Sequence, residues 1–224
     1  MTTRPGFFSS SVGTKVVLGL TGLAMLGFLI GHLAGNLLIL VGPDVFNEYG
    51  HVLVSNPLLV PAELGLLAIL LLHVTKALQN QRANRAARPV AYALKVGAGP
   101  PSRKSAASSS MIVTGLIILG FLVVHIRTFK YGPLYLVEGS DVRNLHRLVV
   151  EVLQQPLWAG FYVICMTLVG MHLRHGISSA FQSLGVDGPS LTPRLLALGK
   201  VLAIVIGGGF ALIPLWIYFV GSPS

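Results

Sequence analysis

Four histidines stand inside runs of apolar residues, where an ionisable side chain is expensive and therefore predicts a functional site. A neutral imidazole can ligate a metal ion through one ring nitrogen while the other donates a hydrogen bond. The first, His32, lies in TGLAMLGFLIGHLAGNLLILV (21–41), among glycines that open one helix face to another helix or to a planar metal macrocycle. For this residue alone, the alternative is an imidazole hydrogen-bonded to a neighbouring helix. The other three are His73, His125 and His172.

The composition indicates what kind of chain must position these histidines. Of 224 residues, 53% are hydrophobic and 10% are charged, and the mean hydropathy is +0.76. So little polar surface cannot cover a water-soluble globule of this size, so we predict an all-α integral membrane protein. The net charge of +9 does not favour nucleic-acid binding, because no soluble domain carries it. The N-terminal stretch lacks the pattern of a removable signal peptide, so we expect the first span to be retained.

Five segments are apolar and long enough to cross a bilayer, which takes about 20 residues. They form a single predicted membrane domain, 1–224, of five transmembrane helices. The predicted spans are residues 16–41, 58–75, 111–126, 157–173 and 195–220. The fifth contains three consecutive glycines and Pro214, which predict a kink or a tight contact.

Two connecting segments have recognisable patterns. The basic loop 76–110 favours the cytoplasmic side, either as an orientation signal on anionic lipid headgroups or as a docking surface for a cytoplasmic partner. In the segment 141–156, apolar residues recur at a helical spacing, which predicts a short interfacial helix. Those residues are Leu145, Leu148, Val149 and Val152.

The distribution of charge fixes the predicted orientation. With a cytoplasmic N-terminus, twelve lysines and arginines fall on the cytoplasmic side and four on the outer side, together with six of the seven acids. This asymmetry is what the positive-inside rule requires. We therefore predict that the N-terminus is cytoplasmic and the C-terminus is outside.

The depth of each histidine then follows from its distance along its span. His32 lies roughly 25 Å along the first, outward-running span, at 1.5 Å per residue, and His125 lies at a similar depth in the third. His73 and His172 come at the ends of the second and fourth spans, which run inward. The four therefore form an outer pair and an inner pair. Two imidazoles from two helices are the axial ligands of a six-coordinate haem, so we predict two b haems suited to electron transfer.

Other residues offer weaker or competing readings. His175 lies three residues from His172 on the same helical face but in the polar boundary, so we assign the iron to His172 and keep His175 as a propionate or quinone partner. His51 and His146 fall in outer loops and are expected to be solvated. The single cysteine, Cys165, excludes a cysteine-ligated cluster and is expected to be a buried apolar residue. A metal-ion transporter would also use buried histidines, but it would add carboxylates near the midplane, which the spans lack.

Four sequence blocks carry a family resemblance. They are GTKVVLGLTGLAMLGFLIGHLAGNLLILVG followed by FNEYG, HVTKALQNQRANRAARPVAY, TGLIILGFLVVHIRTFKYG, and GMHLRHGISSAFQSLG. These blocks resemble the diheme cytochrome b membrane-anchor subunit of succinate dehydrogenase and fumarate reductase. The resemblance extends over nearly the whole chain, and each membrane histidine falls in its own block. In the fourth block, HLRHG matches the family motif with His172 as the ligand, followed by Gly176.

The resemblance implies a role inside a larger enzyme. It implies partnership with a flavoprotein subunit and an iron-sulfur subunit, and exchange of electrons with a quinone, usually menaquinone, in the bacterial cytoplasmic membrane. It also implies that spans one and three hold the outer haem iron, and spans two and four the inner one. The chain by itself has no dinucleotide fingerprint, so catalysis of succinate or fumarate chemistry would belong to the partners. Weak candidates for propionate or quinone contacts are Lys76, Arg174, His175 and Ser178 inside, and Arg127 and Lys130 outside.

Quinone chemistry requires protons as well as electrons, which draws attention to Glu63. It is the one carboxylate at the edge of a predicted span, at about the depth of the outer haem. We therefore name it as a candidate proton-exchanging group at an outer quinone site; an inner site near His73 and His172 stays open. The alternative is a structural acid that follows Pro61 in the first turn of a helix. Two other functions for the chain also stay open, a haem-free structural anchor and a cytochrome b subunit of another oxidoreductase, such as a hydrogenase or nitrate reductase.

Overall fold

The computed structural model describes residues 6–87, 110–186 and 188–221. In these residues the chain is all α-helical, and the one β interaction is an isolated bridge between Leu136 and Arg143. Five helices are long and apolar enough to cross a membrane, which confirms the predicted five-span fold. They are α1 (Ser11–Leu37), α3 (Leu59–Ala86), α5 (Met111–His125) with its helical continuation to Lys130, α7 (Pro156–Ser183) and α8 (Leu191–Val220).

Shorter helices extend or connect the spans. A 3₁₀ turn, η1 (Phe7–Ser9), precedes α1, and a second, η2 (Leu38–Leu40), continues it. A π-helical turn, η3 (Ile126–Lys130), prolongs α5, so the third span continues past the predicted end at 126. Two more α-helices, α2 (Pro43–Ser55) and α6 (Leu145–Leu153), lie between spans. The interfacial helix predicted from the apolar spacing is α6.

Two spans run further than their apolar stretches. The second was predicted to end at 75, but α3 continues to Ala86, so the first part of the predicted loop 76–110 is helical. Residues 88–109 of that loop lie outside the described residues. Similarly, α7 continues past 173 to Ser183. Hydropathy marks where a helix leaves the hydrocarbon, whereas alanine, glutamine and arginine keep it helical beyond that point.

The segment after η2 was expected to be an outer loop, and instead it forms α2. Pro43 opens this helix and Asp44 lies in its first turn, both favourable at a helix N-terminus. The Asn47 side chain joins α2 to α6: its Nδ2 donates to Asn144 Oδ1 at 3.2 Å, and its Oδ1 accepts from the His146 backbone N–H at 2.8 Å. Asn144 in turn caps α6 by accepting from the Arg147 N–H. These bonds fasten the two short helices together at one end of the bundle.

The prediction that His146 is solvated was wrong. His146 is only 8% exposed, because α6 turns it toward the core that this helix forms with α2. Burial lowers the pKa of this imidazole below its ordinary value. His51, on α2, is half-buried rather than fully solvated.

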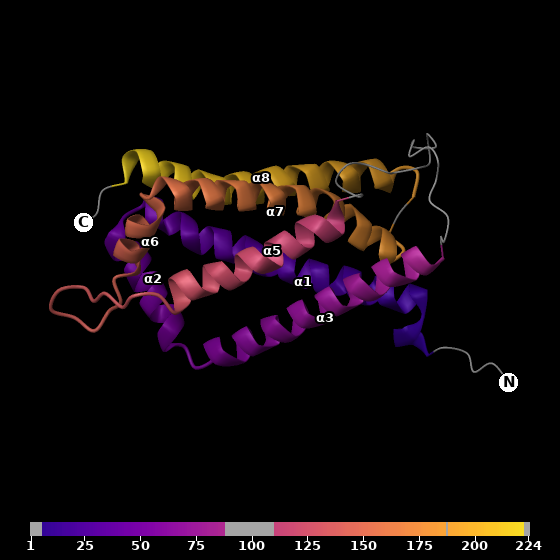
Figure 1. Cartoon of the computed structure of the whole chain (residues 1–224), viewed down its shortest axis with the longest axis horizontal. Helices are drawn as coiled ribbons and strands as arrows, with labels where there is room; N and C mark the ends of the chain where they lie inside the picture. The colour runs from indigo at the N-terminus through magenta and orange to yellow at the C-terminus, as the bar shows by residue number, and fades with distance from the viewer. Residues whose placement is uncertain (1–5, 88–109, 187, 222–224) are drawn as a thin grey trace.

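The spans are arranged as a bundle in which α1 begins at one end and α8 finishes at the other (Figure 1). We call the end where α1 begins the N-terminal end, and the end where α8 finishes the C-terminal end. Helix α1 packs between α3 and α7, α5 packs on α7 and touches α3, and α8 covers α7 and α1. Helices α1 and α5 are thus diagonal to one another, and so are α3 and α7.

The closest helix contact is between α7 and α8. A Cβ atom at Gly207 would lie 2.9 Å from the Cα of Gly170, so the two backbones meet with no room for side chains. This confirms the tight contact predicted in the fifth span, which also accommodates Pro214 within α8. On α1, Gly35 is approached by the ring of Tyr49, but a Cβ at Gly27 or Gly31 would meet nothing within 4 Å. The glycine face predicted beside His32 is therefore contacted at one end only.

Candidate functional site

The two histidines nearest the C-terminal end come from diagonal helices and meet. His32 on α1 and His125 at the end of α5 have ring centroids 5.9 Å apart, with ring planes at 89°. Phe28 stacks on the His32 ring at 5.2 Å, and Phe210 of α8 lies 5.7 Å from it. Further aromatic rings surround His125, namely Phe121, Phe129 and Tyr162. This pair therefore occupies an apolar, aromatic environment.

Each ring of this pair has a polar neighbour. The hydroxyl of Tyr162, a buried residue on α7, lies 3.4 Å from His125 Nδ1. Asn36 lies one turn beyond His32 and its Nδ2 donates to the His32 carbonyl at 2.8 Å, with both ring nitrogens 3.4 Å away. Sequence reasoning placed Tyr162 at the membrane interface and predicted neither residue as a partner of a histidine.

The other two histidines come from the second diagonal pair of helices, nearer the N-terminal end. His73 lies on α3 and His172 on α7, close enough to interact electrostatically. Each ring is met by a threonine from a different helix: Thr21 Oγ1 of α1 lies 3.0 Å from His73 Nδ1, and Thr114 Oγ1 of α5 lies 3.2 Å from His172 Nδ1. All four helices therefore contribute one side chain to this layer.

The residue after each threonine is a glycine that the imidazole approaches. A Cβ at Gly22 would lie 3.4 Å from Cε1 of His73, and one at Gly115 would lie 3.4 Å from Cε1 of His172. Both rings thus rest against the backbone of the neighbouring helix. Sequence reasoning missed this Thr-Gly element, although α1 and α5 share the pattern TGLxxLGFLxxH at 21–32 and 114–125. That internal repeat is the signal from which it could have been found.

The weaker inner candidates lie near this layer, but they do not come together as one site. His175 lies close enough to His172 for an electrostatic interaction, and Ser178 Oγ donates to the His175 carbonyl at 3.1 Å. Arg174 is exposed. Lys76, one turn beyond His73, donates to the Phe8 carbonyl at 2.8 Å and so connects α3 to η1.

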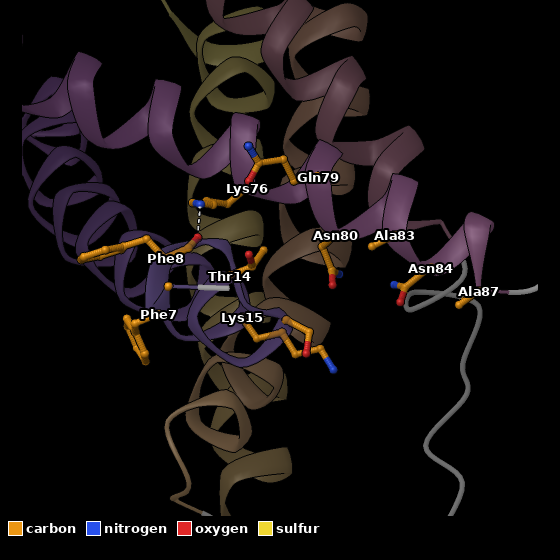
Figure 2. A pocket seen from close by; sticks show the side chains of 12 residues that line it. Phe7, Phe8, Thr14, Lys15, Lys76, Gln79, Asn80, Ala83, Asn84 and Ala87 are labelled. Carbon is orange, nitrogen blue, oxygen red and sulfur yellow. Dashed lines mark hydrogen bonds between the residues drawn. The ribbon is translucent and has the colours of Figure 1, made fainter. Parts of the chain in front are cut away.

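Lys76 also lines a cavity of about 720 Å³ at the N-terminal end. Figure 2 shows that its walls come from η1 and the start of α1 on one side and from the last turns of α3 on the other. Its polar lining groups come from Ser11, Thr14, Lys15, Lys76, Gln79, Asn80 and Asn84. The cavity therefore combines apolar surface with two cationic side chains, Lys15 and Lys76, and it begins one helical turn from His73.

At the C-terminal end, the structure places Glu63 differently from one of its two sequence interpretations. Helix α3 begins at Leu59 and has no acidic residue in its first turn, so the interpretation as a first-turn acid was wrong. The Glu63 carboxylate instead forms an ion pair with Lys130 of η3, and both side chains are partly exposed. Arg127, the other outer candidate, donates to the Tyr131 carbonyl at 2.7 Å. The pair Glu63–Lys130 thus bridges α3 to the end of α5.

A second carboxylate belongs to this end of the bundle, and sequence reasoning overlooked it. Glu151 of α6 accepts from Arg147 Nε at 2.7 Å, and this hydrogen bond, with one from Tyr135, holds the pKa of the carboxyl below its usual range. The Arg147 guanidinium lies over the Tyr135 ring, 4.3 Å from its centroid. Glu151 lines a cavity of about 360 Å³ together with Arg127. The sequence predicted the interfacial helix that carries Glu151, but only the fold shows that this carboxylate shares a cavity with Arg127.

No family model, curated protein or solved structure matches this chain. Among the described residues, no group of three or more His, Cys, Asp or Glu side chains gathers in one place. The membrane histidines instead lie at two levels: His32 and His125 contact one another at the C-terminal end, and His73 and His172, from the other two diagonal helices, lie nearer the N-terminal end.

Proposed function

We propose that this chain is the diheme cytochrome b membrane anchor of a succinate:quinone oxidoreductase in a bacterial cytoplasmic membrane. The observation that carries the proposal is the arrangement of the four membrane histidines as two pairs across the diagonals of one bundle. Two neutral imidazoles facing one another from different helices are the donor set of a six-coordinate haem iron. The sequence blocks that resemble this family contain the same four residues.

The residues fit two b haems by their chemistry. His32 and His125 would hold one iron, and His73 and His172 the other, in a protein of five spans. In both His73 and His172, the ring nitrogen that faces a threonine is Nδ1, which leaves Nε2 for a metal. Haem iron with two axial imidazoles supplies one-electron transfer and has no open position for oxygen. Phenylalanine rings around His32 and His125 exclude water from that layer.

The polarity of the bundle suggests the direction of electron flow. The positive-inside asymmetry favours a cytoplasmic N-terminal end, where the exposed Arg82 and Arg85 of α3 begin the basic segment. We assign this face to docking of an iron-sulfur subunit, which accompanies a flavoprotein subunit. In that orientation, His73 and His172 would hold the haem nearer the electron-donating subunit, and His32 and His125 the haem farther from it.

The quinone, which we take to be menaquinone, needs a proton-exchanging group near a haem level and access to water. At the C-terminal end, two carboxylates meet this requirement, Glu63 paired with Lys130 and Glu151 in the cavity shared with Arg127. The cationic cavity at the N-terminal end is the competing location, with Lys76 as the polar contact.

The test is to express the chain with its partner subunits, purify the complex and record dithionite-reduced minus oxidised spectra. We expect two haems per chain, with loss of the inner haem first in His73→Ala and His172→Ala and of the outer haem first in His32→Ala and His125→Ala. His175→Ala is the matched control for His172→Ala, because the two residues share a face of α7. A haem-free complex would instead favour the structural anchor. Co-purification with hydrogenase or nitrate reductase subunits would favour the other alternative.

A further inference from the structure

We propose that Thr21 and Thr114 are positioning residues that fix the tautomer and ring orientation of His73 and His172. The inference rests on the proposed haem ligation by those two histidines. Its starting observation is that two different helices present the same threonine to the same ring nitrogen, at 3.0 and 3.2 Å. Both threonines are buried, at 7% and 4% exposure.

The direction of these hydrogen bonds follows from where each hydroxyl proton goes. Thr21 Oγ1 donates toward the carbonyls of Val17 and Leu18, at 2.8 and 3.1 Å. Thr114 Oγ1 does the same to Ser110 and Met111, at 3.1 and 3.2 Å. A hydroxyl has one proton and two acceptor lone pairs. With the proton committed to the helix carbonyls, each threonine offers the imidazole only a lone pair.

In the proposed arrangement, each imidazole carries its proton on Nδ1 and donates it to the threonine. That leaves Nε2 unprotonated, as a metal ligand requires, and sets the angle of the ring. The glycine next to each threonine contributes by letting the ring lie against the helix, since a side chain there would press on Cε1. A hydrogen bond of this kind also raises the basicity of the ligand.

The spacing gives α1 and α5 a double role. His32 follows Thr21, and His125 follows Thr114, by eleven residues. Eleven residues make about three turns, so threonine and histidine share a helix face and lie roughly 16 Å apart along the axis. Each of these helices thus provides an iron ligand at one level and positions its neighbour's ligand at the other.

The two sites differ in one respect that sharpens the test. The Leu18 carbonyl also lies within reach of the His73 ring and offers it a second acceptor. For His172, the acceptor found among the described residues is the Thr114 hydroxyl. Removing the hydroxyl at 114 should therefore have the larger effect.

The experiment compares Thr114→Val and Thr21→Val in the full complex, measuring inner-haem retention and its midpoint potential. Valine keeps the shape of threonine but accepts no hydrogen bond. We expect inner-haem affinity to fall about 10- to 100-fold in Thr114→Val, the range for lost partners of metal-ligating histidines, and less in Thr21→Val. The inner-haem potential should rise, since a less basic ligand stabilises the oxidised iron less. Thr114→Ser should restore both properties.

The matched control is Thr167→Val. Thr167 on α7 bonds the Val163 carbonyl as the two threonines bond theirs, at 2.9 Å, but it is exposed and no imidazole contact is described for it. Its removal should leave both haems unchanged. If Thr114→Val does not accumulate, Thr114→Ala takes its place. The positioning role alone would be overturned if the wild-type complex holds two haems and both valine variants keep the inner haem at an unchanged midpoint potential. An equal change in Thr167→Val would overturn it as well. A wild-type complex without haem would overturn the proposed function itself.

Discussion

The contact between α7 and α8 allows a prediction whose size can be worked out from the structure. A Cβ added at Gly207 would lie 2.9 Å from Gly170 Cα, 3.2 Å from Gly170 N and 3.2 Å from Met166 O. All three are backbone atoms, so no side chain can turn away, and the helices must separate. Overpacking of this kind costs about 1–3 kcal/mol. At the next position, a Cβ on Gly208 would meet nothing within 4 Å.

Gly207→Ala and Gly208→Ala are therefore a matched pair. Both gain the same helix propensity, up to about 1 kcal/mol, and only the first has the steric cost. We expect Gly207→Ala to be less stable than Gly208→Ala by about 1–3 kcal/mol, since the propensity gain cancels in the comparison. Thermal and SDS-induced unfolding in detergent, followed by circular dichroism, would measure the difference. A Gly207→Ala protein as stable as Gly208→Ala would refute the direct backbone contact.

Three further predictions concern the two ends of the bundle. Glu63→Gln removes the carboxylate and should change stability by less than about 1 kcal/mol, because the ion pair with Lys130 is partly exposed. If the haems of this variant are reduced but quinone turnover stops, the quinone binds beside Glu63. Unchanged turnover would make the ion pair structural. A triple substitution that neutralises Arg82, Arg85 and Arg88 should weaken binding of the iron-sulfur subunit and make that binding less sensitive to salt in co-purification. Of the three, Arg88 lies outside the described residues. Unchanged binding would remove this face from the docking surface. Burial depresses the pKa of His146 from its usual 6.5, so the fold favours the neutral imidazole. The contribution of His146 to stability should be complete above pH 6.5 and fall as the pH drops below it, by at most about 1.4 kcal/mol per pH unit. His146→Gln should flatten this slope in unfolding curves, and an unaltered slope would assign it to another group.

Much of the fold is determined by the sequence itself. A bilayer imposes one length and one polarity on every span, so hydropathy finds all five helices without any knowledge of their packing. The fixed rise of a helix then assigns a depth to each histidine, and this is why His32 and His125 could be sorted apart from His73 and His172. Helix ends were less accurate, since α3 and α7 continue into water where hydropathy gives no signal.

The tertiary structure decided which side chains meet between elements. Thr21 and Thr114 read as ordinary polar residues in apolar runs until the packing of α1 on α3 and of α5 on α7 brings each to an imidazole. Glu63 was interpreted as a first-turn acid or a proton-exchanging group, and only the fold shows that η3 brings Lys130 to it. The fold likewise places Glu151 in a cavity with Arg127. Depth along a span is a property of the chain alone, because the bilayer sets the axis. Rotation about that axis depends on which helices pack together, and hydrogen bonds between helices are decided by that rotation.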